Sequence, residues 1–80
     1  MKLCEAIRLR MLNLIKTSGL SVNKICEKGL MTTSTLSTYL SSKNVYCSTR
    51  TLAKFCQGAD ITIKEFFDDA LFDNIEDDSI

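Results

Sequence analysis

The side chains that could carry out catalysis or hold a metal ion are few in this chain of 80 residues. Histidine, the commonest general base and metal ligand, does not occur at all. No nucleophile stands beside a base, and no glycine-rich loop could cradle a phosphate. Acids near the carboxyl end could suggest a divalent-ion site, but a solvated acidic segment explains them more simply: Asp68, Asp69, Asp77 and Asp78. We therefore expect no enzyme activity, no metal and no cofactor.

The cysteines are the remaining reactive groups, and none of them forms the C-x-x-C pair of zinc sites and redox motifs. An even number of cysteines in a short chain could also form disulfides. However, the sequence does not begin like a signal peptide, because charged residues come before any apolar run of the required length: Glu5, Arg8 and Arg10. No stretch approaches the ~20 apolar residues needed to span a bilayer. We therefore expect a cytoplasmic protein with free thiols at Cys4, Cys26, Cys47 and Cys56.

The charged residues sum to a net charge of zero but are unevenly distributed. Residues 1–59 hold nine Lys and Arg against two Glu, a net charge of +7. Residues 60–80 hold one Lys against eight acids, a net charge of −7. A basic body with an acidic end is compatible with a polyanionic partner. It is equally compatible with a solvated surface that ends in a solvated acidic segment.

Apolar residues recur at the spacing of buried helical stripes, separated by glycines and by residues that cap helices. Ile7, Met11 and Leu14 predict a first helix over about 3–17, which stops before Gly19. Three further helices are predicted to begin at residues whose side chains are preferred as amino-terminal caps: Ser21, Thr32 and Ser48.

The second helix, over about 22–29, carries small residues at Cys26 and Gly29 that would let a neighbouring helix approach closely. The third, over about 33–41, is rich in Thr and Ser, which compete with the helix for local hydrogen bonds. We expect it to be helical only because its neighbours hold it. Cys26, and Cys56 on the fourth helix, lie on inward stripes and are expected to be small core residues.

The start of a fifth helix is the clearest, because Thr62 and Glu65 have the spacing of a capping box. Ile61 before this cap can pack against Phe66 at the fourth helical position. Beyond Asp69 the composition turns acidic, and we expect the chain to fray.

These elements predict an all-α fold of five short helices around one core. Residues 1–69 would form one domain, and residues 70–80 an acidic tail that could take part in a dimer interface.

Five segments of the chain resemble the phage-repressor/Cro-like helix-turn-helix family, also called the XRE family, over about fifty residues without gaps. The segments are G-L-S at 19–21, I-C-E-K at 25–28, S-T-L-S at 34–37, R-T-L-A-K-F-C at 50–56 and I-T-I-K-E-F-F at 61–67. The resemblance implies a lambda-repressor-like bundle in which helix 33–41 enters the major groove of double-stranded DNA. It thereby implies a transcriptional regulator of the repressor type that occupies an operator.

Positions that match the family pattern also imply the residues of the DNA interface. Those facing base edges would be Thr33, Ser34, Ser37 and Thr38, which share one face of a helix. Those beside phosphates would be Ser21, Asn23, Lys24, Ser41, Lys43 and Asn44. Further candidates for neutralising phosphates are Lys16, Lys28, Arg50 and Lys54. A polar face of short side chains suits a helix that lies deep in a groove about 12 Å wide, but such faces are also common on solvated helices.

The chain departs from the family pattern at several positions. The expected recognition face has no Arg, Lys, Asn or Gln, so direct readout of bases should be weak and reliant on DNA shape or on apolar contact with thymine. Leu30 stands where the turn glycine is usual, so either the turn is reshaped around Gly29 or Leu30 adopts the backbone conformation of a glycine. Ile15 and Leu40 replace an Arg–Glu ion pair that many relatives have, which should not harm the fold.

Relatives of this size commonly form dimers on paired half-sites. We expect a homodimer whose two-fold interface is formed by Phe67, Leu71, Phe72 and Ile75. The alternative is that these residues fold back to close their own core. An alternative function is a protein-interaction module of the antitoxin or anti-repressor type, which keeps the bundle without specific DNA binding. The chain has no room for a separate ligand-sensing domain, so we expect no small-molecule ligand.

Overall fold

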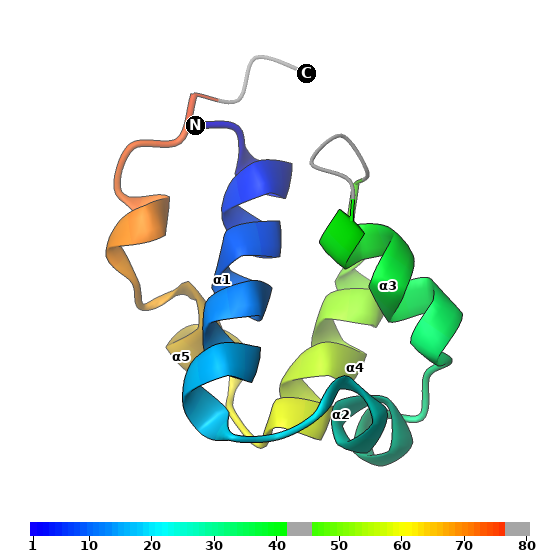
Figure 1. Ribbon diagram of the computed structural model, residues 1–80. Coiled ribbons are helices and arrows are strands. Elements are labelled where there is room, and N and C mark those ends of the chain that lie inside the picture. The colour runs from blue at the N-terminus through cyan, green and yellow to red at the C-terminus, as the bar shows by residue number, and fades with distance from the viewer. Residues whose placement is uncertain (42–45, 77–80) are drawn as a thin grey trace.

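A computed structural model describes residues 1–41 and 46–76 and shows helices without any strand among these residues (Figure 1). The elements are α1 (Leu3–Ser18), α2 (Val22–Gly29), α3 (Thr33–Ser41), α4 (Thr49–Ala59), α5 (Ile63–Phe67) and a 3-10 helix, η1 (Ala70–Phe72). The prediction of an all-α fold with five short helices is confirmed.

The predicted helix starts are confirmed by hydrogen bonds at their caps. The Ser21 hydroxyl accepts a hydrogen bond from the Lys24 amide at 3.2 Å. The capping box of α5 is complete, because Thr62 Oγ1 accepts from the Glu65 amide at 3.0 Å and the Thr62 amide donates to Glu65 Oε1 at 2.9 Å. The hydrogen bond from the Thr62 amide, and next the Thr62 side chain, hold the pKa of the Glu65 carboxyl below its usual value. The Ser48 hydroxyl accepts from the Thr51 amide at 3.2 Å.

Three helices, α1, α2 and α4, end in a left-handed residue, and only the residue that ends α1 is a glycine. Gly19, with a φ of 76°, ends α1 as predicted. Leu30 ends α2 with a φ of 58°, and Asp60 ends α4 with a φ of 63°. Of the two alternatives for the turn after α2, the structure shows the second: Leu30 itself adopts the conformation that favours glycine, and Gly29 stays inside the helix.

The closest packing in the bundle is between α2 and α4, where two glycines bring the backbones together. A Cβ atom added to Gly29 would lie 2.2 Å from the Lys54 carbonyl oxygen, and one added to Gly58 would lie 2.1 Å from the Ile25 carbonyl oxygen. The close approach expected at Gly29 is therefore confirmed. Gly58 lies buried inside α4.

The core lies where the four longer helices meet α5. Its largest side chains are fully buried: Phe55, Phe66, Met11, Ile25 and Leu36. Cys26 and Cys56 are buried in this core as predicted, and none of the four cysteines forms a disulfide. Burial raises the pKa of the Cys56 thiol to about 11, although the nearby Arg10 guanidinium acts in the opposite direction.

After α5, residues 70–72 form a 3-10 helix, Phe72 packs against the core and Glu76 bonds Met1, so the expectation of fraying beyond Asp69 is wrong for residues 70–76. Figure 1 shows this segment running back along α1 to the amino end of the chain. Arg10 on α1 donates to the carbonyls of Glu65 and Phe66 at 2.9 and 2.8 Å and pairs with Asp69 at 3.2 Å. One side chain thus satisfies the free carbonyls at the end of α5 and fixes the chain that follows.

The end of the segment is joined to the first residue. The Met1 ammonium group lies 3.1 Å from Glu76 Oε1, and the Glu76 amide donates to the Met1 carbonyl at 2.9 Å. Residues 77–80, the last part of the predicted acidic tail, lie outside the described residues.

Candidate functional site

The outer face of α3 carries the side chains that sequence reasoning assigned to base edges. Thr33, Ser34, Ser37 and Thr38 are all exposed. On the opposite side of the same helix, Leu36 is completely buried. The structure therefore brings the four hydroxyl side chains together on one outward surface, which we call the hydroxyl face.

Two groups from outside the helix hold α3 in place at its ends. At its start, Thr32 Oγ1 accepts from the Thr35 amide at 3.2 Å and lies 2.8 Å from the Thr35 hydroxyl. At its end, Arg8 Nη1 on α1 donates to the Leu40 carbonyl at 3.4 Å. These contacts and the burial of Leu36 explain how a segment with poor helix propensity forms a helix.

The structural roles of Arg8 and Arg10 were not predicted from the sequence. Arg8 bonds a carbonyl 32 residues away, and Arg10 bonds carbonyls 55 and 56 residues away, which no local pattern reveals. Both guanidinium groups therefore bind the protein itself, so the basic body presents fewer cations to a partner than its net charge indicates.

The hydroxyl groups of the hydroxyl face differ in whether they already donate a hydrogen bond within the protein. Thr38 Oγ1 donates to the Ser34 carbonyl at 2.9 Å, and Ser41 Oγ donates to the Thr38 carbonyl at 3.4 Å. Within residues 1–41 and 46–76, the hydroxyls of Thr33, Ser34 and Ser37 have no intramolecular partner. The face therefore presents three hydroxyls that can both donate and accept, and one that can only accept without breaking a bond.

The residues assigned to phosphates are placed as follows. Ser21 is exposed at the amino end of α2, where its hydroxyl caps the helix. Asn23, Lys24 and Ser41 are exposed. Lys43 and Asn44 lie outside the described residues. The further cations Lys16, Lys28 and Arg50 are exposed, and Lys54 is half-buried.

The four apolar residues assigned to a dimer interface divide into two kinds. Phe67 and Phe72 pack against the core of their own chain, with ring centroids 4.8 Å apart, and both contact Phe66. These two rings are half-buried within their own chain, and their place in a dimer interface stays a prediction. Leu71 and Ile75 are half-buried.

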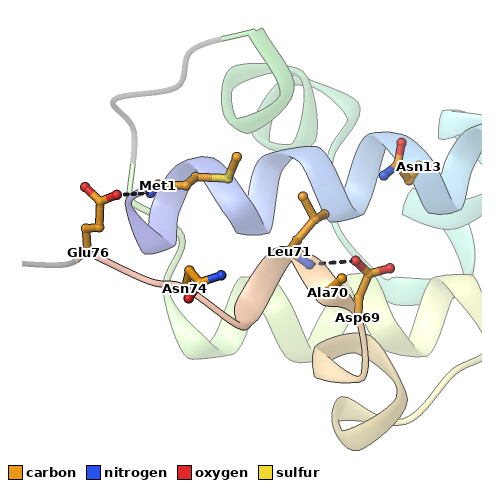
Figure 2. Close-up of a pocket in the computed structure, with 7 residues that line it drawn as sticks. All are labelled: Met1, Asn13, Asp69, Ala70, Leu71, Asn74 and Glu76. Carbon is orange, nitrogen blue, oxygen red and sulfur yellow. Dashed lines mark hydrogen bonds and ion pairs between the residues drawn. The ribbon is translucent and has the colours of Figure 1, made fainter.

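Leu71 lines an open depression of about 490 Å³ between α1 and the C-terminal segment (Figure 2). The other residues around it are Met1, Asn13, Asp69, Ala70, Asn74 and Glu76. Figure 2 shows its two ends fixed by the contact of Met1 with Glu76 and by the Leu71 amide, which donates to Asp69 Oδ1 at 2.9 Å.

The positions that depart from the family pattern are accommodated without an ion pair. Ile15 and Leu40 are both half-buried and pack against the core. Leu30 is 75% exposed, so its side chain adds little packing to offset its left-handed backbone.

Tyr46, just before α4, is a second large apolar side chain with high exposure, at 62%.

The described ranges contain no group of three or more Cys, Asp or Glu residues placed to hold a metal ion. None of the helices in these same ranges is long and apolar enough to pass through a bilayer. Comparisons with protein-family models, with curated proteins and with solved structures found no match for this chain.

Proposed function

We propose that this chain is a small helix-turn-helix DNA-binding protein of the phage-repressor/Cro-like type, which regulates transcription as a repressor by occupying an operator. In this proposal α2 and α3 are the two helices of the motif, and α3 enters the major groove. The observation that carries the proposal is the outward hydroxyl face of α3 (Thr33, Ser34, Ser37 and Thr38) directly opposite the buried Leu36.

The composition of the hydroxyl face suits close contact with DNA. Short side chains let the backbone of a helix approach the base edges of a groove about 12 Å wide. Hydroxyl groups can donate to or accept from any base pair, and a Thr methyl can pack on a thymine methyl. The sequence of α3 contains no acidic residue that would repel phosphates.

Phosphate contacts would come from the exposed Lys24, Lys28 and Arg50 and from the amino end of α2 at Ser21. With about four phosphates neutralised, the logarithm of the association constant should fall with the logarithm of salt concentration at a slope of about −3 to −4.

The first experiment is selection of bound duplexes from a random DNA pool, followed by fluorescence anisotropy on the enriched sequence at several salt concentrations. The proposal expects one enriched motif and the salt slope given above. Enrichment of no motif, or a slope near zero, would contradict it.

A pair of variants tests the phosphate contacts. Lys24→Gln should weaken binding to all sequences and make the slope shallower by about one unit. Lys64→Gln on α5 removes the same charge from an exposed position outside the proposed interface and should leave both values unchanged.

We also propose that the protein binds as a two-fold dimer, because one module of this size buries little surface on DNA. Leu71 is the residue to test, since Phe72 has a second role in the core. Leu71→Asp should remain folded and sediment as a monomer where the parent sediments as a dimer. A parent that is monomeric both alone and on a duplex with two half-sites would contradict the dimer.

A second candidate function is a protein-interaction module on the same bundle. The exposed apolar side chains of Leu30 and Tyr46 favour it, because large apolar groups at such exposure are suited to a protein partner. The selection experiment separates the two functions, since a protein-interaction module would enrich no DNA sequence.

A further inference from the structure

The hydroxyl of Thr38 differs from the others on the hydroxyl face because its proton is used inside the helix. Thr38 Oγ1 donates to the Ser34 carbonyl at 2.9 Å. A threonine hydroxyl has one proton, so this oxygen can accept a hydrogen bond from outside but cannot donate one unless the internal bond breaks.

This internal bond limits which base edges Thr38 could contact. Guanine O6 and N7, adenine N7 and thymine O4 are all acceptors and need a donor from the protein. Thr38 has no free donor for them. Its methyl group remains, and the bond to the Ser34 carbonyl orients it, because fixing Oγ1 fixes the other substituent on Cβ.

We propose that Thr38 is a specificity-determining residue of this protein and that its methyl group reads the 5-methyl group of one thymine in the major groove. The inference rests on the proposed function, since it names what the same face of α3 recognises. Thr38 is exposed, so its methyl is available for apolar contact, and thymine is the base that presents a methyl group in the major groove.

Ser37 provides the internal contrast. It lies beside Thr38 on the same exposed face, has no methyl group, and its hydroxyl has no intramolecular partner within the described residues. It can donate to the acceptors on guanine, adenine or thymine. Removing a thymine methyl should therefore affect a contact of Thr38 and leave a contact of Ser37 unchanged.

The test uses the full chain and the duplex enriched by selection. Each thymine is replaced in turn by uracil, which removes only the 5-methyl group. Each duplex is titrated with the parent, with Thr38→Ser, which keeps the hydroxyl and loses the methyl, and with Thr38→Val, which keeps a methyl at Cγ2. Ser37→Ala is the matched control from the same face. Circular dichroism and urea unfolding establish that each variant is folded.

We expect one thymine whose replacement weakens binding of the parent about fourfold, as burial of a single methyl predicts. Thr38→Ser should bind the thymine duplex about fourfold more weakly than the parent does, and its affinity should fall no further when that thymine is replaced by uracil. The affinities of Thr38→Val and Ser37→Ala should still fall on this replacement. Normal, motif-specific binding without any thymine coupled to Thr38 would overturn this inference and leave the proposed function standing. Failure to enrich any motif would overturn both.

Discussion

Two consecutive helices of this protein, α2 and α3, are held in the bundle in opposite ways. Backbone contact fixes α2, because Gly29 and Gly58 leave no room for a Cβ atom between α2 and α4. Side-chain anchoring holds α3 instead, with Leu36 completely buried and with contacts at its two ends from Thr32 and Arg8.

This difference shows that α2 is part of the packed bundle, whereas α3 has one side free to contact a partner. Backbone-to-backbone packing defines the position of α2 tightly and tolerates no added atom. Anchoring through one side of α3 leaves its other side outward, where Thr33, Ser34, Ser37 and Thr38 add no packing. Substitutions at the α2–α4 contact should therefore affect stability, and substitutions on the hydroxyl face should affect only binding.

The largest loss is expected for Gly58→Ala. The added Cβ would lie 2.1 Å from the Ile25 carbonyl oxygen, and because this atom belongs to the backbone of α2, the two helices must separate. The free energy of unfolding, measured by urea denaturation, should fall by about 4 kcal/mol or more.

Gly19→Ala is the control for the loss of a glycine. Its Cβ would meet no atom within 4 Å, so only the left-handed backbone opposes the substitution, at about 1 kcal/mol. Equal losses for the two variants would show that α2 and α4 are farther apart than the structure has them.

The next largest effect is expected for Leu36→Ala. Leu36 is fully buried, so its truncation should lower the free energy of unfolding by about 3 kcal/mol. Ser37→Ala, one residue along on the outward side, should change it by less than about 0.5 kcal/mol. If both changes are small in thermal and urea melts, α3 is not anchored as described.

A smaller effect is expected from Cys56 at alkaline pH. Burial raises the pKa of this thiol from 9.0 to about 11, so the folded state holds the proton more tightly than the unfolded chain does. The resulting stabilisation is complete below pH 9 and is lost as the pH rises through about 11. It amounts to about 2–3 kcal/mol at most.

Cys56→Ala removes this contribution, and we expect the variant to be less stable than the parent at neutral pH. The difference in unfolding free energy between parent and variant should therefore shrink between pH 8 and pH 11. A difference that stays constant over this range would show that the Cys56 thiol titrates in the folded protein as it does in the unfolded chain.

The smallest effect expected is a gain in stability at the turn between α2 and α3. Leu30 has a φ of 58° and is 75% exposed, so Leu30→Gly relieves the strained backbone and removes little packing. The free energy of unfolding should rise by about 0.5–1 kcal/mol.

Asp60→Gly is the matched comparison, because Asp60 ends α4 in nearly the same conformation, with a φ of 63°. Aspartate tolerates this conformation better than leucine, so the gain should be smaller. A loss of stability in Leu30→Gly would mean that the Leu30 side chain packs in solution against something that stabilises the turn.

The sequence was sufficient to predict the features that depend on neighbouring residues. The caps at Ser21, Ser48 and Thr62 and the stop at Gly19 are set by contacts within about four residues, so their patterns can be read locally. That Thr33, Ser34, Ser37 and Thr38 share one face of a helix followed in the same way from helical spacing.

Features that depend on distant residues were not predictable in this way. The role of Gly58 as a contact for Ile25 was not predicted, because it requires knowing which helix crosses α4 at that point. The path of the chain after α5 was missed as well, because Arg10 lies 59 residues before Asp69 and carries no local sign of that pairing. The left-handed Leu30 was one of two alternatives, because sequence alone did not show whether Gly29 would absorb the turn.

The most direct test of the account is the affinity of Ser37→Asp for the selected duplex, measured by anisotropy beside Lys64→Gln, which shifts the net charge by the same unit. A carboxylate in the middle of the hydroxyl face should weaken binding by about 100-fold or more, because it would be desolvated against base edges between two phosphate backbones. The Lys64→Gln variant should bind as the parent does. If Ser37→Asp is folded and binds as tightly as Lys64→Gln, the outward face of α3 is not the surface that meets DNA.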